Sequence, residues 1–138
     1  MIKALGFAAI LMVAAVPAFA DSNCSVATLR GGYGATGTGS LAPNNQAPAA
    51  LIARIVFDGA GNFTASETRS INGTVTRGVS FSGTYTLNAA CQGSATVSGG
   101  TNAGYDLVVD AAGTHVRAIA TVGGTTFTVD MTKQFLGG

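Results

Sequence analysis

Five ionisable residues occupy positions where the alternation of the sequence otherwise places apolar side chains: Arg54, Glu67, Arg69, His115 and Arg117. Side chains alternate between the two faces of a strand, so residues an even number of positions apart share a face. Each of the five shares its face with apolar residues in this way, as Arg54 does with Ile52 and Val56. Buried charge is costly unless it is paired, so this phase predicts a compensated network or a hydrated ligand-binding pocket. The alternative is that β-bulges or strand ends turn these side chains toward water.

The same residues permit one concrete catalytic hypothesis. Glu67 and His115, polarised by Arg69 or Arg117, would form an acid–base pair for proton transfer or cyclisation of a small organic substrate. This requires the two side chains to lie within hydrogen-bonding range, directly or through one water. The sequence contains no Gly-x-Ser-x-Gly elbow, and a serine triad would have only His115 as its base. We therefore assign no catalytic residue and expect binding rather than an enzymatic activity.

The sequence favours neither a metal site nor a bound cofactor. His115 is the only histidine, and the only two cysteines, Cys24 and Cys91, are expected to pair with each other. In the segment 58–62 only Asp58 carries a charge, which is too few acidic ligands for a calcium loop. In an oxidising compartment the cysteines form a disulfide, closing a loop of roughly 65 residues and stabilising the fold by about 4 kcal/mol.

Residues 1–20 have the features of a cleavable export signal. Lys3 supplies the positive charge, residues 4–16 form an unbroken apolar run, and residues 18–20, Ala-Phe-Ala, match a cleavage site. The apolar run is shorter than the roughly twenty residues that span a bilayer. We expect a mature protein that begins at Asp21, is secreted or periplasmic, and has no stable insertion in a membrane.

The charge balance disfavours nucleic-acid binding. The chain of 138 residues has seven Lys and Arg against six Asp and Glu, and removal of Lys3 leaves the two signs equal. A mature chain without net charge has no broad electrostatic attraction to nucleic acid or to an anionic membrane. Its length fits one domain, residues 21–138, with one modest core.

Apolar alternation separated by turn residues predicts an all-β fold. The strongest strand signal covers residues 49–58, and Asn72-Gly73 is a two-residue hairpin signal between residues 63–71 and 74–87. A bulge is expected near Arg77 and Gly78. Sequential hairpins of about eight antiparallel strands close most simply into a single up-and-down β-barrel, with a two-sheet β-sandwich as the alternative.

Several segments together resemble a group of small secreted bacterial proteins of unknown function. They are residues 29–34, 57–63, 71–75 and 81–88, the last followed by Cys91. The resemblance implies a single β-rich domain, and because its motifs are turns and strand residues it specifies the fold and not the activity. The pattern is also loosely similar to the barrels of allene oxide cyclases and other lipocalin-like folds, which implies a small apolar or cyclisable ligand. No catalytic residue of the cyclases matches this sequence, so their activity is not carried over.

The leading interpretation is an exported, disulfide-tied β-barrel that binds a small, partly apolar ligand through Arg54, Glu67, Arg69, His115 and Arg117. One alternative is a structural or interaction protein that associates with itself or with an envelope assembly, because its surface is rich in Gly, Thr and Ser. Less favoured are an isomerase resembling allene oxide cyclase and a small outer-membrane barrel. The second lacks an aromatic girdle.

Overall fold

The computed structural model describes residues 23–98 and 103–134, so the predicted export signal lies outside the described residues. A short 3-10 helix, η1 (Val26–Thr28), precedes the first strand. The strands are β1 (Arg30–Leu41), β2 (Ala47–Asp58), β3 (Asn62–Ile71), β4 (Thr74–Leu87), β5 (Gln92–Ser98), β6 (Gly104–Val109), β7 (His115–Ala120) and β8 (Thr126–Lys133).

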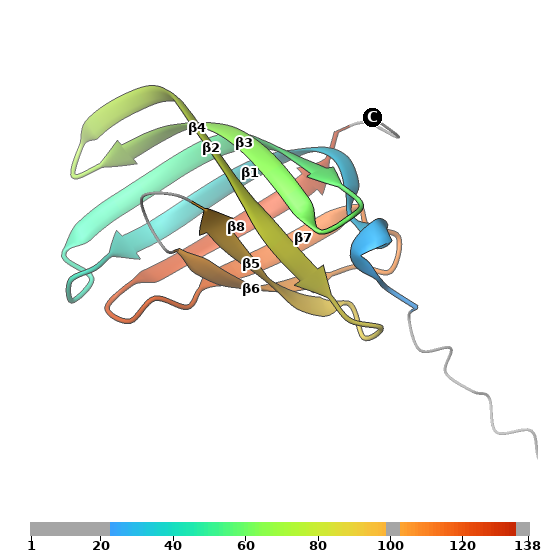
Figure 1. The fold of residues 1–138 in the computed structure, drawn as a ribbon. Helices are drawn as coiled ribbons and strands as arrows, with labels where there is room; N and C mark the ends of the chain where they lie inside the picture. The colour runs from blue at the N-terminus through green and yellow to red at the C-terminus, as the bar shows by residue number, and fades with distance from the viewer. Residues whose placement is uncertain (1–22, 99–102, 135–138) are drawn as a thin grey trace, which may run out of the picture.

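The strands form a closed barrel in sequence order. Each pairs antiparallel with the next, and β8 pairs with β1 to complete the ring. In Figure 1 the long hairpins of β1 to β4 and the shorter strands β5 to β8 wrap around one interior. The predicted up-and-down barrel of eight strands is confirmed, and closure excludes the two-sheet sandwich. Closure also removes the exposed strand edges that an open meander would leave.

The predicted hairpin and bulge between β3 and β4 are both confirmed. Asn72 and Gly73 connect the two strands with positive φ angles of 53° and 80°, which suit these residue types. Farther along, the register skips between Glu67 and Arg69, so Arg77 and Gly78 on β4 oppose a single β3 residue. Gly78 has φ of 67°. This bulge lies beside the two ionisable residues of β3.

One end of the barrel is filled by aromatic side chains and covered by the N-terminal segment. Phe57 packs edge-on against Tyr33 and Tyr85, with ring centroids 5.2 and 5.1 Å apart. The Tyr85 hydroxyl has two carbonyl acceptors near η1, Val26 at 2.6 Å and Leu29 at 2.9 Å. The Tyr33 hydroxyl donates to the Gly113 carbonyl in the β6–β7 turn. This packing plugs one end of the barrel.

The disulfide ties the N-terminal segment to the plugged end. Cys24 and Cys91 are bonded, with their Cα atoms 5.1 Å apart, and both residues are buried. Cys91 lies in the β4–β5 turn, so the bond joins the segment before η1 to the barrel as predicted. A disulfide of this kind is consistent with a periplasmic or extracellular protein.

The predicted inner faces are confirmed for β3, β4 and β8 but are wrong for β2 and β7. On β4, Phe81, Gly83, Tyr85 and Leu87 face the interior, and the Ser and Thr residues between them are exposed, as predicted. On β2, the predicted inner residues Ile52 and Arg54 are exposed, Ile52 by 62%. On β7, Arg117 and Ile119 are exposed, while the intervening residues face the core. Both strands have apolar residues on each face, so alternation alone does not identify the inner one.

Candidate functional site

The barrel interior contains a cavity of about 670 Å³. Its lining includes Leu41, Ile71, Val122 and Thr125, which flank the β1–β2, β3–β4 and β7–β8 connections. These connections lie at the end of the barrel opposite the η1 plug. The cavity walls are mostly aliphatic and aromatic, and the volume is in the range of small-molecule binding sites. The interior is therefore solid at the plugged end and hollow toward the other.

Glu67, Arg69 and Tyr105 are the largest polar side chains that line this cavity, and the hydroxyls of Ser80 and Thr125 add to its lining. Glu67 and Arg69 lie two residues apart on β3 and therefore face the same side, while Tyr105 is at the start of β6. Nε of Arg69 lies 3.0 Å from Oε1 of Glu67. The Nε–H does not point at the carboxylate, so the contact is an ion pair without a hydrogen bond.

None of the three groups hydrogen-bonds to another described residue. The buried Nε of Arg69 has no acceptor there, and no hydrogen bond is formed by the Glu67 carboxylate or the Tyr105 hydroxyl. Buried polar groups in proteins nearly always have a partner, either in the protein or in water or a ligand. A polar cluster that has no hydrogen-bond partner among the described residues, inside a cavity, is thus equipped to bind another molecule.

The surroundings of the cluster shift two pKa values. Burial raises the pKa of Glu67, and the charge of Arg69 opposes that rise only in part. Burial also raises the pKa of Tyr105, and the nearby Glu67 charge raises it further. The Tyr105 hydroxyl consequently remains a protonated hydrogen-bond donor at neutral pH.

The structure brings only two of the five predicted site residues together. Glu67 and Arg69 share the cavity, whereas Arg54, His115 and Arg117 lie on the outer surface of β2 and β7. The inward placement expected for these three is wrong. Their role in binding was inferred from that placement, so the interior site has to be built on Glu67 and Arg69.

The proposed acid–base pair of Glu67 and His115 is not formed. Glu67 faces the interior from β3, while His115 faces outward from β7, half the ring of eight strands away. His115 instead pairs with a β8 residue, its Nε2 lying 2.7 Å from Oδ1 of Asp130. Nε of Arg117 lies 3.9 Å from the other oxygen of Asp130. The geometry thus gives His115 an electrostatic partner but no contact with the cavity.

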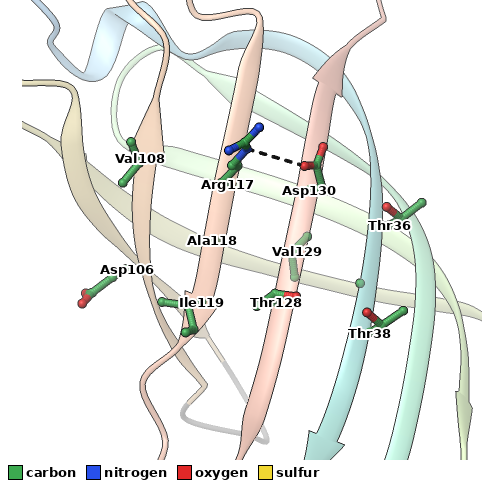
Figure 2. A pocket seen from close by; sticks show the side chains of 11 residues that line it. Thr36, Thr38, Asp106, Val108, Arg117, Ala118, Ile119, Thr128, Val129 and Asp130 are labelled. Atoms are coloured by element: carbon green, nitrogen blue, oxygen red, sulfur yellow. Dashed lines mark ion pairs between the residues drawn. The ribbon is translucent and has the colours of Figure 1, made fainter.

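Arg117 and Asp130 border a groove of about 450 Å³ on the outside of the barrel. Figure 2 shows Arg117 and Asp130 reaching toward each other across β7 and β8, with Thr36 on the adjoining strand β1. Val108 and Ile119 expose 58% and 51% of their surface there. The groove presents aliphatic side chains and one ion pair on an otherwise threonine-rich face.

Sequence reasoning did not identify Tyr105 as a site residue. The alternation along β6 does indicate that Tyr105 points inward. Tyr105 shares a face with Leu107 and Val109, which are both buried. The residues of the other face, Asp106 and Val108, are exposed. A polar-tipped aromatic residue on the inner face of a short strand is a candidate for a cavity wall. The sequence does not show that β6 and β3 line the same cavity, which depends on the closed barrel.

The described residues contain no group of three or more His, Cys, Asp or Glu side chains placed to bind a metal ion. None of the helices in the described part is long and apolar enough to cross a membrane. No known protein family, curated protein or solved structure matches the chain in sequence or fold comparison. The interior cavity therefore has to be interpreted from its own geometry.

Proposed function

We propose that this protein is an exported, non-enzymatic carrier that binds a small, partly apolar ligand inside its barrel. The observation that carries the proposal is the cavity of about 670 Å³, with mostly apolar walls and a polar cluster that has no hydrogen-bond partner within residues 23–98 and 103–134. Apolar walls supply affinity, and a few convergent polar groups supply orientation. A closed up-and-down barrel of eight strands can hold one small ligand in its interior, which is in keeping with this role.

The division of the barrel into a plugged and a hollow end supports a carrier function. The disulfide and the aromatic cluster stabilise one end, so the other can keep a cavity without collapse of the fold. An empty apolar cavity costs stability, because its lining loses van der Waals contacts. A cavity of this size in so small a domain is therefore expected to serve binding.

A cavity-filling variant tests the proposal. Ala53 on β2 lines the cavity and is the cross-strand neighbour of Glu67 on β3. The substitution Ala53→Phe therefore places an aromatic ring in the binding space. The matched control is Ile52→Phe, because Ile52 is the next residue of the same strand and faces outward. Binding of the neutral fluorescent probe N-phenylnaphthylamine should be lost in Ala53→Phe and kept in Ile52→Phe. Equal binding by both folded variants would contradict an interior site.

A second candidate function is self-association through the outer face. It is favoured by three exposed aliphatic residues: Val108 and Ile119 line the outer groove, and Ile52 on β2 pairs with Thr36 at its border. Sedimentation velocity over a wide concentration range tests this role. A concentration-dependent dimer that Ile119→Asp abolishes would support it, and a monomer at all concentrations would refute it.

A further inference from the structure

The accessible charge in the cavity belongs to Arg69 rather than to Glu67. The Arg69 side chain is 35% exposed, whereas the Glu67 side chain is 7% exposed. Their closest contact uses Nε, and no acceptor among the described residues is hydrogen-bonded to any nitrogen of this guanidinium. A guanidinium carries five N–H donors, so most of its donor capacity is free for another molecule.

Tyr105 on β6 adds a second donor to the same cavity, close enough to Glu67 for that charge to affect its pKa. Because its hydroxyl makes no hydrogen bond to another described residue, it too can donate to a bound group. The remaining polar group, Glu67, is an acceptor, but it is largely buried beneath the ion pair. A molecule that enters the cavity thus meets mainly donors, and one of them is cationic. The complementary chemical group is an anionic acceptor.

We propose that the cavity binds an amphipathic monocarboxylate, with its carboxylate on Arg69 and Tyr105 and its hydrocarbon chain along the apolar walls. The inference rests on the proposed function, since it specifies the ligand of the same cavity. Arginine is well matched to a carboxylate, because its planar N–H groups can donate two parallel hydrogen bonds. The aliphatic and aromatic lining, which includes Leu51, Phe81 and Phe127, contacts the chain.

Glu67 sets the selectivity of this arrangement. It neutralises Arg69 in the free protein and competes with the ligand carboxylate for the same guanidinium. Its other neighbours add no positive charge, because Ala53 on β2 and Val79 on β4 flank it in the sheet. Removing the Glu67 charge should therefore tighten binding of the carboxylate and leave binding of a neutral analogue unchanged.

The test compares three probes with one chain length: decanoate, decanol and decylammonium. Each competes with N-phenylnaphthylamine for the purified protein, below its micelle concentration. We expect decanoate to displace the probe at a concentration lower than the other two by about tenfold or more. Equal displacement by all three, or preference for the ammonium, would overturn the carboxylate assignment while the carrier function stands. Absence of binding by every compound would contradict the carrier function itself.

Variants locate the preference on Arg69. Arg69→Met should abolish the advantage of decanoate over decanol, Arg69→Lys should retain part of it, and Glu67→Gln should increase it. Arg77→Gln is the matched control, because it removes one arginine charge at an exposed position of β4. Arg69→Met leaves Glu67 buried beside no cation, so the double variant Glu67→Gln/Arg69→Met provides a neutral version of the site. If that folded double variant still preferred decanoate, the assignment to Arg69 would be wrong.

Discussion

Glu67 is the one buried acidic side chain among the described residues, and its environment makes the carboxyl group harder to ionise than it is in water. Burial raises its pKa, and Arg69 offsets that effect only in part. A carboxyl group that is harder to ionise in the folded state than in the unfolded state makes folding less favourable once the pH is high enough to ionise it. The polar cluster is thus kept at some cost in stability, as is common at binding sites.

The first prediction concerns the pH dependence of stability. Between the ordinary pKa of glutamate and the raised folded-state pKa, the folded protein holds more protons at Glu67, so its contribution to the free energy of unfolding falls as pH rises. Glu67→Gln should remove this decline. At neutral pH we expect the variant to be more stable than the wild type, because the cost of ionising a buried carboxyl group is removed. Thermal melts of both proteins from acidic to neutral pH measure the difference.

Gln is the suitable replacement because it keeps the shape of the side chain while removing the ionisation. If Glu67→Gln instead melted at a lower temperature than wild type at neutral pH, the ion pair with Arg69 would outweigh the cost of burial. The two outcomes have opposite signs, so the melting temperature alone decides between them.

Each turn at the plugged end begins with an Asp or Asn whose side chain caps the backbone. Asp58, Asn88 and Asp110 each accept two backbone N–H hydrogen bonds through Oδ1, at 2.6 to 3.1 Å. Asp58 ends β2, and Asn88 and Asp110 directly follow β4 and β6, so these side-chain caps recur in all three hairpins of that end. Asp and Asn favour such turns because their short side chains reach nearby backbone groups, here two to five residues ahead.

The second prediction concerns the β6–β7 turn. Burial acts to raise the pKa of Asp110, but the hydrogen bonds from Thr114 and His115, aided by the charge of His115, lower it overall. Asp110→Ala should lower the free energy of unfolding by about 1–2 kcal/mol, because these hydrogen bonds are lost. The turn also holds the Gly113 carbonyl that accepts from Tyr33, so its loss should loosen the plug. Chemical denaturation measures the change.

Asp106→Ala provides the control, since Asp106 is exposed on the neighbouring strand. The sign of the pH effect gives a further check. Because the folded-state pKa of Asp110 is lowered, its contribution is present above the ordinary pKa of aspartate and is lost as pH falls through the lowered value. Asp110→Asn keeps an acceptor oxygen and should lack this acid sensitivity. An Asp110→Ala variant as stable as Asp106→Ala would show that the cap contributes nothing.

The strands differ in how well their sequence predicts their faces. In β4 and β8 one face is formed by Thr, Ser or Asp, so a period of two residues identifies the core face directly. In β2 the residues on both faces are aliphatic, and Ile52 is no less apolar than the buried Ile55. There the face depends on pairing with Arg69 and Glu67 on β3, which is tertiary information. Hence the inward position of Glu67 and Arg69 could be predicted from the sequence, whereas the outward position of Arg54 could not.

At the scale of the whole molecule, stability and binding occupy opposite ends of the barrel. The plugged end holds the aromatic cluster, the capped turns and the disulfide, and the hollow end holds the cavity. Barrel closure follows from the number of sequential hairpins and could be predicted from the sequence. The cavity depends on how the interior side chains fill the closed ring, and no local pattern in the sequence reports that volume.

The third prediction is that the disulfide stabilises the fold without shaping the cavity. The bond between Cys24 and Cys91 closes a loop spanning 67 residues, which restricts the unfolded chain. Cys24→Ser/Cys91→Ser should lower the free energy of unfolding by about 2–5 kcal/mol, a large share of the stability of a small domain. Under conditions where the variant remains folded, it should still bind N-phenylnaphthylamine with wild-type affinity, because the disulfide lies at the end of the barrel far from the cavity.

Chemical denaturation measures the free energy of unfolding and probe titration measures the affinity, with reduced wild type as the control. A folded variant that had lost probe binding would show that the two ends are coupled through the barrel.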